Sequence, residues 1–232
     1  MTLFRRTIPI SIYAPPSGVS AISVLKTLAK KRPFAESNGF MSPTHLREDR
    51  VSSVCILPLK RTVRTVSFEN HEPIYTDRGV RVLEGITIVA TEKNTLEFLG
   101  VDRPLLASLK TIIGMIKDET AAELSEWKIP RDSWHRLFLS STAISRCVFA
   151  AKEGQYQLHS SPDTSPAEVK ARKEIINKAT RLWFVGYAPL GQERIAYAFS
   201  PGSNRIVVYN FIRNPIGWPS LFRFLDEFVY GG

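Results

Sequence analysis

Cysteine is scarce in this 232-residue sequence, which contains only Cys55 and Cys147. Two cysteines are too few for a disulfide framework or for a zinc site built from thiolates. The four histidines are far apart in the sequence and match no metal-binding spacing. Glycine-rich phosphate-binding loops and serine-nucleophile signatures are absent as well. We therefore expect no metal, no cofactor and no catalytic site.

Long apolar runs are also missing, since no stretch approaches the roughly 20 residues that cross a bilayer as a helix. We expect no transmembrane segment. The apolar residues that are present make up 44% of the chain, and 10% of it is aromatic. This composition excludes a disordered chain and is enough for a packed core of one large domain or two small ones.

Acidic side chains are outnumbered, 22 against 31 basic ones, which gives a formal net charge of +9. The excess lies at the two ends. Residues 1–50 hold eight basic and three acidic side chains, and residues 136–232 hold twelve and seven. Such segregation favours contact with a polyanion, either the phosphate backbone of a nucleic acid or an anionic lipid surface. The alternative is that the charge only keeps the protein soluble.

The first 50 residues are expected to form a basic, proline-containing flexible arm and linker. Prolines interrupt residues 8–16, which should be extended. Residues 19–31 have apolar positions at helical spacing and predict a short basic amphipathic helix. Three roles are open for it: docking on the protein's own core, lying on an anionic membrane or nucleic acid, or mitochondrial targeting. The candidate binding residues are Arg5, Arg6, Lys26, Lys30, Lys31 and Arg32.

Residues 51–92 are rich in β-branched side chains and predict a hairpin of two long strands. We expect a loop at residues 69–73 and a turn at residues 77–79. Three bases of the first strand, Lys60, Arg61 and Arg64, have no acidic neighbour in the sequence. They form either a phosphate-binding edge or a solvated edge that resists aggregation.

A single helical turn is expected at residues 95–99, followed by a helix over residues 105–116 whose apolar stripe faces the core. The acidic residues between 118 and 126 either bind a metal or form a solvated helix face, and we expect the solvated face. Residues 137–151 predict a strand. The next helix, over residues 165–180, carries a basic stripe that faces either phosphate or bulk solvent, formed by Lys170, Lys173, Asn177 and Arg181.

Three strands of an antiparallel meander are expected over residues 182–212, separated by strong turn signals. If its aromatic face is exposed it is a base-stacking platform, and if it is buried it is core; its residues are Tyr197, Phe199, Tyr209 and Phe211. A last helix begins near Pro219. It either closes the core or binds a partner through Leu221, Phe222, Leu225 and Phe228.

Together these patterns predict an α+β protein with two antiparallel sheet regions and packing helices, in which residues 51–232 form the body after the arm. The body is either one unit or two subdomains, 51–135 and 136–232. The favoured function is non-catalytic: binding of a polyanion, RNA or an anionic membrane surface, with possible self-association. This general character is similar to that of small viral matrix or nucleic-acid-packaging proteins, by analogy alone.

Two other functions stay open. One is a metal-dependent nuclease that uses Asp163 and Glu168 or the acidic residues of 118–126. The other is an imported component of an organellar ribonucleoprotein complex. The location expected is intracellular, in the cytoplasm or nucleus or peripheral to a membrane, with the mitochondrion as the alternative.

Overall fold

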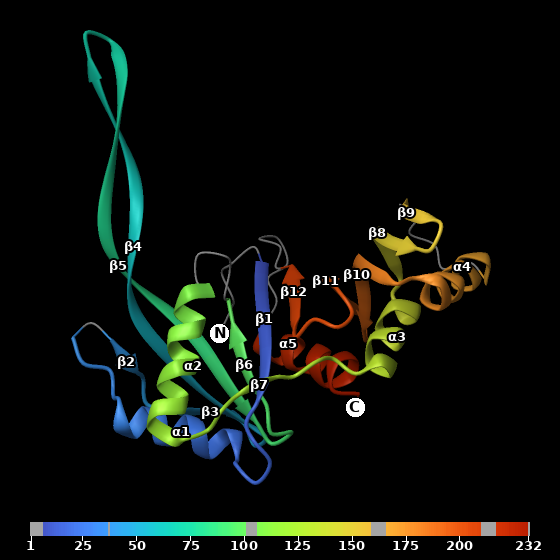
Figure 1. The fold of residues 1–232 in the computed structure, drawn as a ribbon, viewed down its shortest axis with the longest axis horizontal. Helices are drawn as coiled ribbons and strands as arrows, with labels where there is room; N and C mark the ends of the chain where they lie inside the picture. Colours follow the sequence, from blue (N-terminus) through green and yellow to red (C-terminus); the bar gives the residue numbers. More distant parts are fainter. Residues whose placement is uncertain (1–6, 37, 101–105, 159–165, 210–216, 232) are drawn as a thin grey trace. The chain divides into compact units, whose positions relative to one another are not determined.

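The computed structural model describes residues 7–36, 38–100, 106–158, 166–209 and 217–231. Helices are interspersed among runs of antiparallel strands, which confirms the expected α+β class (Figure 1). The chain divides into two units. Unit 1 comprises Met1–Tyr13, Leu99–Asp102 and Glu126–Gly232, and unit 2 comprises Ala14–Phe98 and Arg103–Ser125.

The sheet of unit 1 is fully antiparallel, with strand order β1-β12-β11-β10-β8-β9. Its strands are β1 (Thr7–Ala14), β8 (Ala143–Ala151), β9 (Gly154–Leu158), β10 (Arg181–Leu190), β11 (Glu193–Phe199) and β12 (Arg205–Tyr209). Strands β10 to β12 confirm the predicted meander as far as Tyr209; the end of that prediction, residues 210–212, lies outside the described ranges.

Helices of unit 1 cover one face of this sheet. They are α3 (Arg131–Ser140), α4 (Pro166–Lys178), α5 (Trp218–Phe224) and the π-helical turn η2 (Leu225–Val229). The ring of Phe138 on α3 contacts that of Phe184 on β10, and Phe224 on α5 contacts Tyr197 on β11. Each such ring, when fully buried, stabilises the fold by about 1.5–3 kcal/mol. The core of unit 1 therefore lies between these helices and one face of the sheet.

The expectation of a flexible N-terminal arm is wrong for the described part of residues 1–50. Strand β1 pairs with β12, and Ile8, Ile10 and Ile12 are buried. The alternating isoleucines bury one face of the strand. The free energy gained by this burial outweighs the lost ladder hydrogen bond of the proline, which had suggested an unpaired extended segment. Helix α1 (Ala21–Lys31) also docks on the protein itself, because its apolar face is buried.

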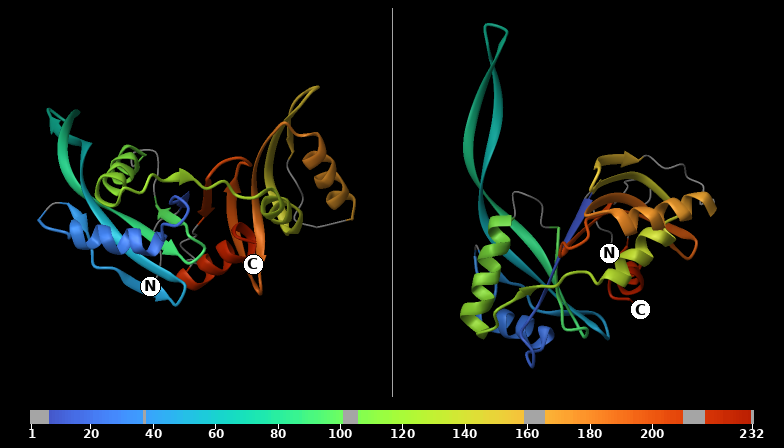
Figure 2. Two further views of the ribbon diagram at one scale, coloured as in Figure 1. Left: turned by 60° about the horizontal axis from the view of Figure 1, so that its bottom comes forward. Right: turned by 45° about the vertical axis from the view of Figure 1, so that its right-hand side comes forward.

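Unit 2 contains antiparallel strands and two helices (Figure 2). Its strands follow the order β2-β4-β5-β6, and β3 pairs with β4. They are β2 (Gly39–Phe40), β3 (Thr44–Arg47), β4 (Arg50–Glu69), β5 (Glu72–Thr91) and β6 (Leu96–Leu99). Helix α1 packs on α2 (Leu106–Thr120), whose predicted stripe is buried at Leu109, Ile112 and Ile116. The two-residue strand β7 (Ser125–Glu126) follows.

Three local predictions are wrong. The hairpin turn lies at Asn70 and His71, whose φ angles are +51° and +66°, inside the predicted loop of residues 69–73, but the strand continues through residues 77–79, where a turn was expected. Residues 96–99 form β6 and not a helical turn, because the segment is buried on both sides. Residues 137–140 belong to α3; the chain becomes a strand only after Ser141, whose hydroxyl donates to the Leu137 carbonyl.

Candidate nucleic-acid interface

The face of the unit 1 sheet that points away from its helices carries aromatic and basic side chains. Along β10, Leu182 and Phe184 are buried in the core, whereas Trp183, Val185 and Tyr187 are only partly buried. Successive side chains of a strand point to opposite faces, so the second group lies on the other side. We call this side the meander face; its members are Arg146, Val148, Arg181, Trp183, Val185, Tyr187, Arg194, Arg205, Val207 and Tyr209.

An arginine and a tryptophan make the closest cation–π contact on the meander face. Trp183 is opposite Val148, and Val185 is opposite Arg146, so Arg146 and Trp183 are diagonal neighbours on β8 and β10. The central guanidinium carbon of Arg146 lies 5.6 Å from the centre of the Trp183 ring. A positive group beside a partly exposed ring is suited to a ligand that has both a phosphate and a flat base.

Small residues occupy the middle of the meander face. On β11, Ala198 lies between Val185 of β10 and Val207 of β12, and Ala196 is opposite Tyr187. Tyr209 lies on β12, at the other side of β11. The two tyrosines stand on strands that flank the alanines, about 10 Å apart across the sheet. Ala196 and Ala198 are buried beneath their neighbours, whereas the flanking Tyr187 and Tyr209 are partly exposed.

Arginines surround these aromatic rings. Arg146, Arg181 and Arg194 are exposed, and Arg205 is half-buried. The predicted basic stripe of one helix is wrong at its end, since α4 stops at Lys178 and Arg181 is the first residue of β10. Lys170, Lys173 and Asn177 are exposed on α4 as predicted, but only Arg181 belongs to the meander face.

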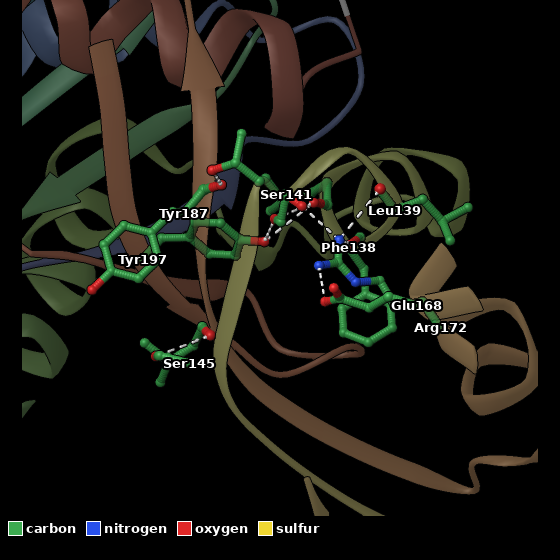
Figure 3. Close-up of polar contacts among 11 residues, drawn as sticks. Phe138, Leu139, Ser141, Ser145, Glu168, Arg172, Tyr187 and Tyr197 are labelled. Atoms are coloured by element: carbon green, nitrogen blue, oxygen red, sulfur yellow. Dashed lines mark hydrogen bonds and ion pairs between the residues drawn. The ribbon is translucent and has the colours of Figure 1, made fainter. Parts of the chain in front are cut away.

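A buried polar network fixes α4 and the meander to α3 (Figure 3). Arg172 of α4 is 3% exposed; its Nη1 donates to the carbonyls of Ser141 and Phe138, and its Nη2 lies 2.6 Å from Glu168. The carbonyls at the end of α3 have no partner within that helix, so the guanidinium caps them. Sequence patterns did not reveal this role, because the sequence alone does not distinguish a buried arginine from the solvent-exposed bases of the same helix.

Tyr197 is part of the same network. Its hydroxyl lies 2.6 Å from the Ser141 hydroxyl and donates to the Leu137 carbonyl. A Cβ atom at Gly186 would lie only 2.9 Å from the Tyr197 hydroxyl oxygen, so glycine is needed at this position of β10. Burial raises the pKa of Tyr197 well above its ordinary value, because the phenolate would be desolvated.

The predicted stacking residues are wrong for Tyr197 and Phe199, which are buried in the core and not exposed. Tyr197 contacts Phe224 of α5 and donates to the Leu137 carbonyl of α3, and Phe199 contacts Phe184 of β10, so these two residues are core, which was the other interpretation of this face. Tyr209 is half-buried on the meander face, and Phe211 lies outside the described residues. Sequence reasoning missed Trp183 and Tyr187. Their signal was the alternation of residues 181–190, which places them opposite Leu182 and Phe184.

The C-terminal helix closes the core, which was one of its two expected roles, and its four residues are not available to bind a partner. Each of its four proposed contact residues is at most 2% exposed, and they pack within unit 1: Leu221, Phe222, Leu225 and Phe228. The segment closes the core because its apolar face is wide, and it changes from α5 to the π-helical turn η2 at Leu225.

The predicted bases of unit 2 have mixed surroundings. Lys26 and Lys30 are exposed on α1. Lys31 donates to the Glu119 carbonyl, and Arg32 forms an ion pair with the Glu119 carboxylate at 2.6 Å. Lys60 is exposed on β4, and Arg64 is paired with Asp77 at 2.9 Å. Arg5 and Arg6 and the side chain of Arg61 lie outside the described part of the chain.

Among the described residues, no three His, Cys, Asp or Glu side chains are grouped as ligands of a metal ion. Glu168 is held by Arg172, and Asp163 lies outside the described residues. Within the part of the chain that the structure describes, none of the helices has both the length and the apolar character needed to span a bilayer.

Comparisons with known proteins give no relatives. No protein-family model matches the chain, no curated protein matches it, and no solved structure matches its fold.

Proposed function

We propose that this protein is a non-catalytic binding protein for single-stranded nucleic acid, with RNA as its partner and the meander face as the contact surface. The observation that carries the proposal is the arrangement of Trp183, Tyr187 and Tyr209 on one sheet face among four arginines. Sheets that present aromatic rings stack the bases of single strands, and nearby arginines neutralise the phosphates.

An anionic membrane is the less favoured polyanion. Membrane-surface helices insert an apolar face into the lipid, and α1 was the candidate for such a helix. Its apolar residues are buried against the rest of unit 2, so only polar side chains, Ser23 and its three lysines, would face a bilayer. Lysines alone supply weak attraction, roughly 1 kcal/mol each near an anionic surface. This supports nucleic acid over lipid as the partner.

The proposal is tested by fluorescence anisotropy with a labelled single-stranded RNA of about 12 nucleotides. Replacing one stacking side chain, as in Trp183→Ala or Tyr187→Ala, should cost about 1–3 kcal/mol, which is roughly 5- to 150-fold in Kd. Tyr156→Ala is the matched control. Tyr156 is an exposed aromatic residue of the same sheet, but its ring stacks on Phe149 on the other face.

A salt titration and a lipid flotation assay separate RNA from lipid as the partner. Binding to RNA should weaken with salt, with a slope of about −0.7 per phosphate contacted. Flotation with vesicles that contain an anionic lipid serves as the comparison. RNA binding that is equal in the wild type, Trp183→Ala and Tyr187→Ala, together with capture by anionic vesicles, overturns the proposal.

A further inference from the structure

A long hairpin of unit 2 extends beyond the core of that unit. Strands β4 and β5 pair over 20 residues each, from Arg50 opposite Thr91 to Glu69 opposite Glu72. Beyond residue 57 most of the described side chains are exposed, and in Figures 1 and 2 this half extends past the helices of its own unit. We call residues 58–83 the β-arm. Its length is about 40 Å, at 3.3 Å per residue.

The two faces of the β-arm differ in exposure where the arm leaves the core. Successive side chains of a strand point to opposite faces, and directly opposed residues of two strands share a face. Lys60 and the opposed Arg81 are exposed, whereas Leu59 and the opposed Val82 are half-buried. The half-buried pair continues the face on which Leu57 is buried in the core of unit 2. We therefore call that face the inner face, and we call the face of Lys60 and Arg81 the outer face.

Charges are divided unequally between the two faces. The outer face holds three exposed basic side chains and one exposed acidic one, which are Lys60, Arg64, Arg81 and Asp77. The two carboxylates at the tip, Glu69 and Glu72, are directly opposed to each other on the inner face. This acidic pair points away from the outer face, which therefore carries a net positive charge. A surface of this charge attracts a polyanion.

Two aromatic rings lie on the same outer face, toward the tip. Phe68 is 72% exposed and Tyr75 is 61% exposed. Tyr75 is opposite Val66, the outer-face neighbour of Phe68 on β4, so the backbones of the two aromatic residues are diagonal neighbours about 7–8 Å apart. The central guanidinium carbon of Arg64 lies 6.0 Å from the centre of the Tyr75 ring. The outer face therefore has the same combination of a guanidinium and a ring as the meander face.

We propose that the outer face of the β-arm is a second binding surface for single-stranded nucleic acid. Tyr75 and Phe68 stack on its bases. Lys60 and Arg81 contact its phosphates, six to eight residues or about 20–26 Å from the rings along the arm. The class of ligand rests on the proposed function, but no residue is shared with the meander face, so the two surfaces are tested separately.

Other occupants fit the outer face less well. Two outer faces of two copies would oppose surfaces with the same net charge, which weakens association. In a nucleic-acid duplex the base faces are covered by stacked neighbours, so only base edges would meet the exposed rings. An anionic bilayer would receive Phe68 together with the tip carboxylates Glu69 and Glu72, which its surface charge repels. A single strand has accessible bases and phosphates, and therefore uses both the rings and the positive charge.

The test uses a full-length protein in which Trp183→Ala and Tyr187→Ala remove the rings of the meander face. Fluorescence anisotropy measures its binding to a labelled single-stranded RNA of about 12 nucleotides. This protein should still bind, and adding Tyr75→Ala should raise Kd roughly 5- to 150-fold, because one base loses its stacking partner. Ile74→Ala is the matched control, since Ile74 is an exposed residue of the same strand on the inner face. Far-ultraviolet circular dichroism checks that all variants fold.

Removal of the two basic charges gives a second measurement in the same protein. Lys60→Gln with Arg81→Gln should reduce the slope of log Kd against log salt by about 1.4, the value for two phosphates of a single strand. Arg78→Gln is the control, because Arg78 is an exposed base of the inner face. A slope that is the same in the two variants would show that Lys60 and Arg81 contact no phosphate, which would overturn the proposal.

The outcomes separate this surface from the meander face. If the protein with Trp183→Ala and Tyr187→Ala binds no RNA, or if Tyr75→Ala and Ile74→Ala bind equally well, the β-arm proposal is overturned and the meander face stands. If those two meander substitutions leave the affinity of the wild type unchanged and Tyr75→Ala lowers it, the β-arm proposal is supported and the meander face is overturned. Tighter binding to duplex DNA than to the single strand, or capture by anionic vesicles without RNA binding, would also overturn the β-arm proposal.

Discussion

The guanidinium of Arg146 and the indole of Trp183 form one composite surface on two adjacent strands, with 5.6 Å between the guanidinium carbon and the ring centre. Neither residue is held in the core: Arg146 is exposed, and Trp183 is half-buried. A contact of this kind contributes about 0.5–1 kcal/mol at an exposed site, which is little for stability. Its effect on a ligand is larger, because it fixes a charge beside a ring face.

Removal of this charge should change the salt dependence of RNA binding more than the fold. With Arg146→Gln we expect weaker binding and a slope of log Kd against log salt that falls by roughly 0.7, the value for one phosphate of a single strand. The control is Lys128→Gln, an exposed base of unit 1 that is not on the meander face. An unchanged slope in Arg146→Gln would show that its guanidinium contacts no phosphate.

Tyr197→Phe should destabilise unit 1 because the Ser141 hydroxyl loses its 2.6 Å partner. The expected cost is about 1 kcal/mol, since Ser141 keeps its hydrogen bond to the Leu137 carbonyl. Urea unfolding followed by circular dichroism measures it. Tyr209→Phe is the matched control, because Tyr209 is half-buried on the meander face and has no part in this network. Equal midpoints for both variants would contradict the assignment.

The same residue gives a pH prediction whose sign follows from its raised pKa. Tyr197 stays protonated in the folded state, whereas the unfolded chain ionises it near its ordinary value of 10.0. The contribution of the Tyr197 hydroxyl to the free energy of unfolding is therefore fully present below pH 10 and is lost as the pH rises above that value. The difference in unfolding free energy between wild type and Tyr197→Phe should shrink above pH 10, which urea titrations at pH 8 and about pH 10.5 measure. A difference that is constant with pH would contradict it.

The spacing of apolar residues in the sequence predicted those elements that bury a single face. The stripe of α2 is buried with a spacing near 3.6, and strands β10 and β12 are buried with a spacing of 2, as their apolar residues show. The face of the meander was not predictable in the same way. Both faces of β10 carry aromatic or apolar residues, Phe184 on one side and Trp183 on the other. Which one is covered depends on where α3 and α5 pack, and this is a tertiary contact.

The prolines near the N-terminus led to the wrong prediction of an unpaired extended segment. Pro9 cannot donate a ladder hydrogen bond, yet it lies within β1, opposite Val207 of β12. Its own carbonyl accepts a hydrogen bond from the Gly100 amide, so the residue is still tied into the sheet. The full length of strand β5 was missed for the opposite reason. The sequence of residues 77–79 has the signature of a turn, but the tip at Asn70 and His71 sets the register, and Gly79 becomes an ordinary partner of Thr62.

Arg172→Met tests whether the buried guanidinium is structural. The change leaves the carbonyls of Ser141 and Phe138 without their donor and the Glu168 carboxylate without its cation. We expect a loss of about 3 kcal/mol in unfolding free energy. Lys173→Met, at the exposed neighbouring position, should change it by less than about 0.5 kcal/mol. Arg172→Lys should lie between them, because a lysine keeps the charge but cannot span several carbonyls. A stable Arg172→Met protein would mean that water replaces the guanidinium.

The two buried thiols report on the two units separately, because Cys55 lies in unit 2 and Cys147 in unit 1. Burial raises the pKa of Cys55 to about 12 and that of Cys147 to about 11. At pH 8 both are therefore protonated and covered, so neither should react with a disulfide reagent until its unit opens. In the variants Cys55→Ser and Cys147→Ser, the rate of labelling of the remaining thiol should rise with urea as that unit unfolds. Rapid labelling of either thiol in the absence of urea would contradict its burial, and identical urea dependence in the two variants would show that the units unfold together.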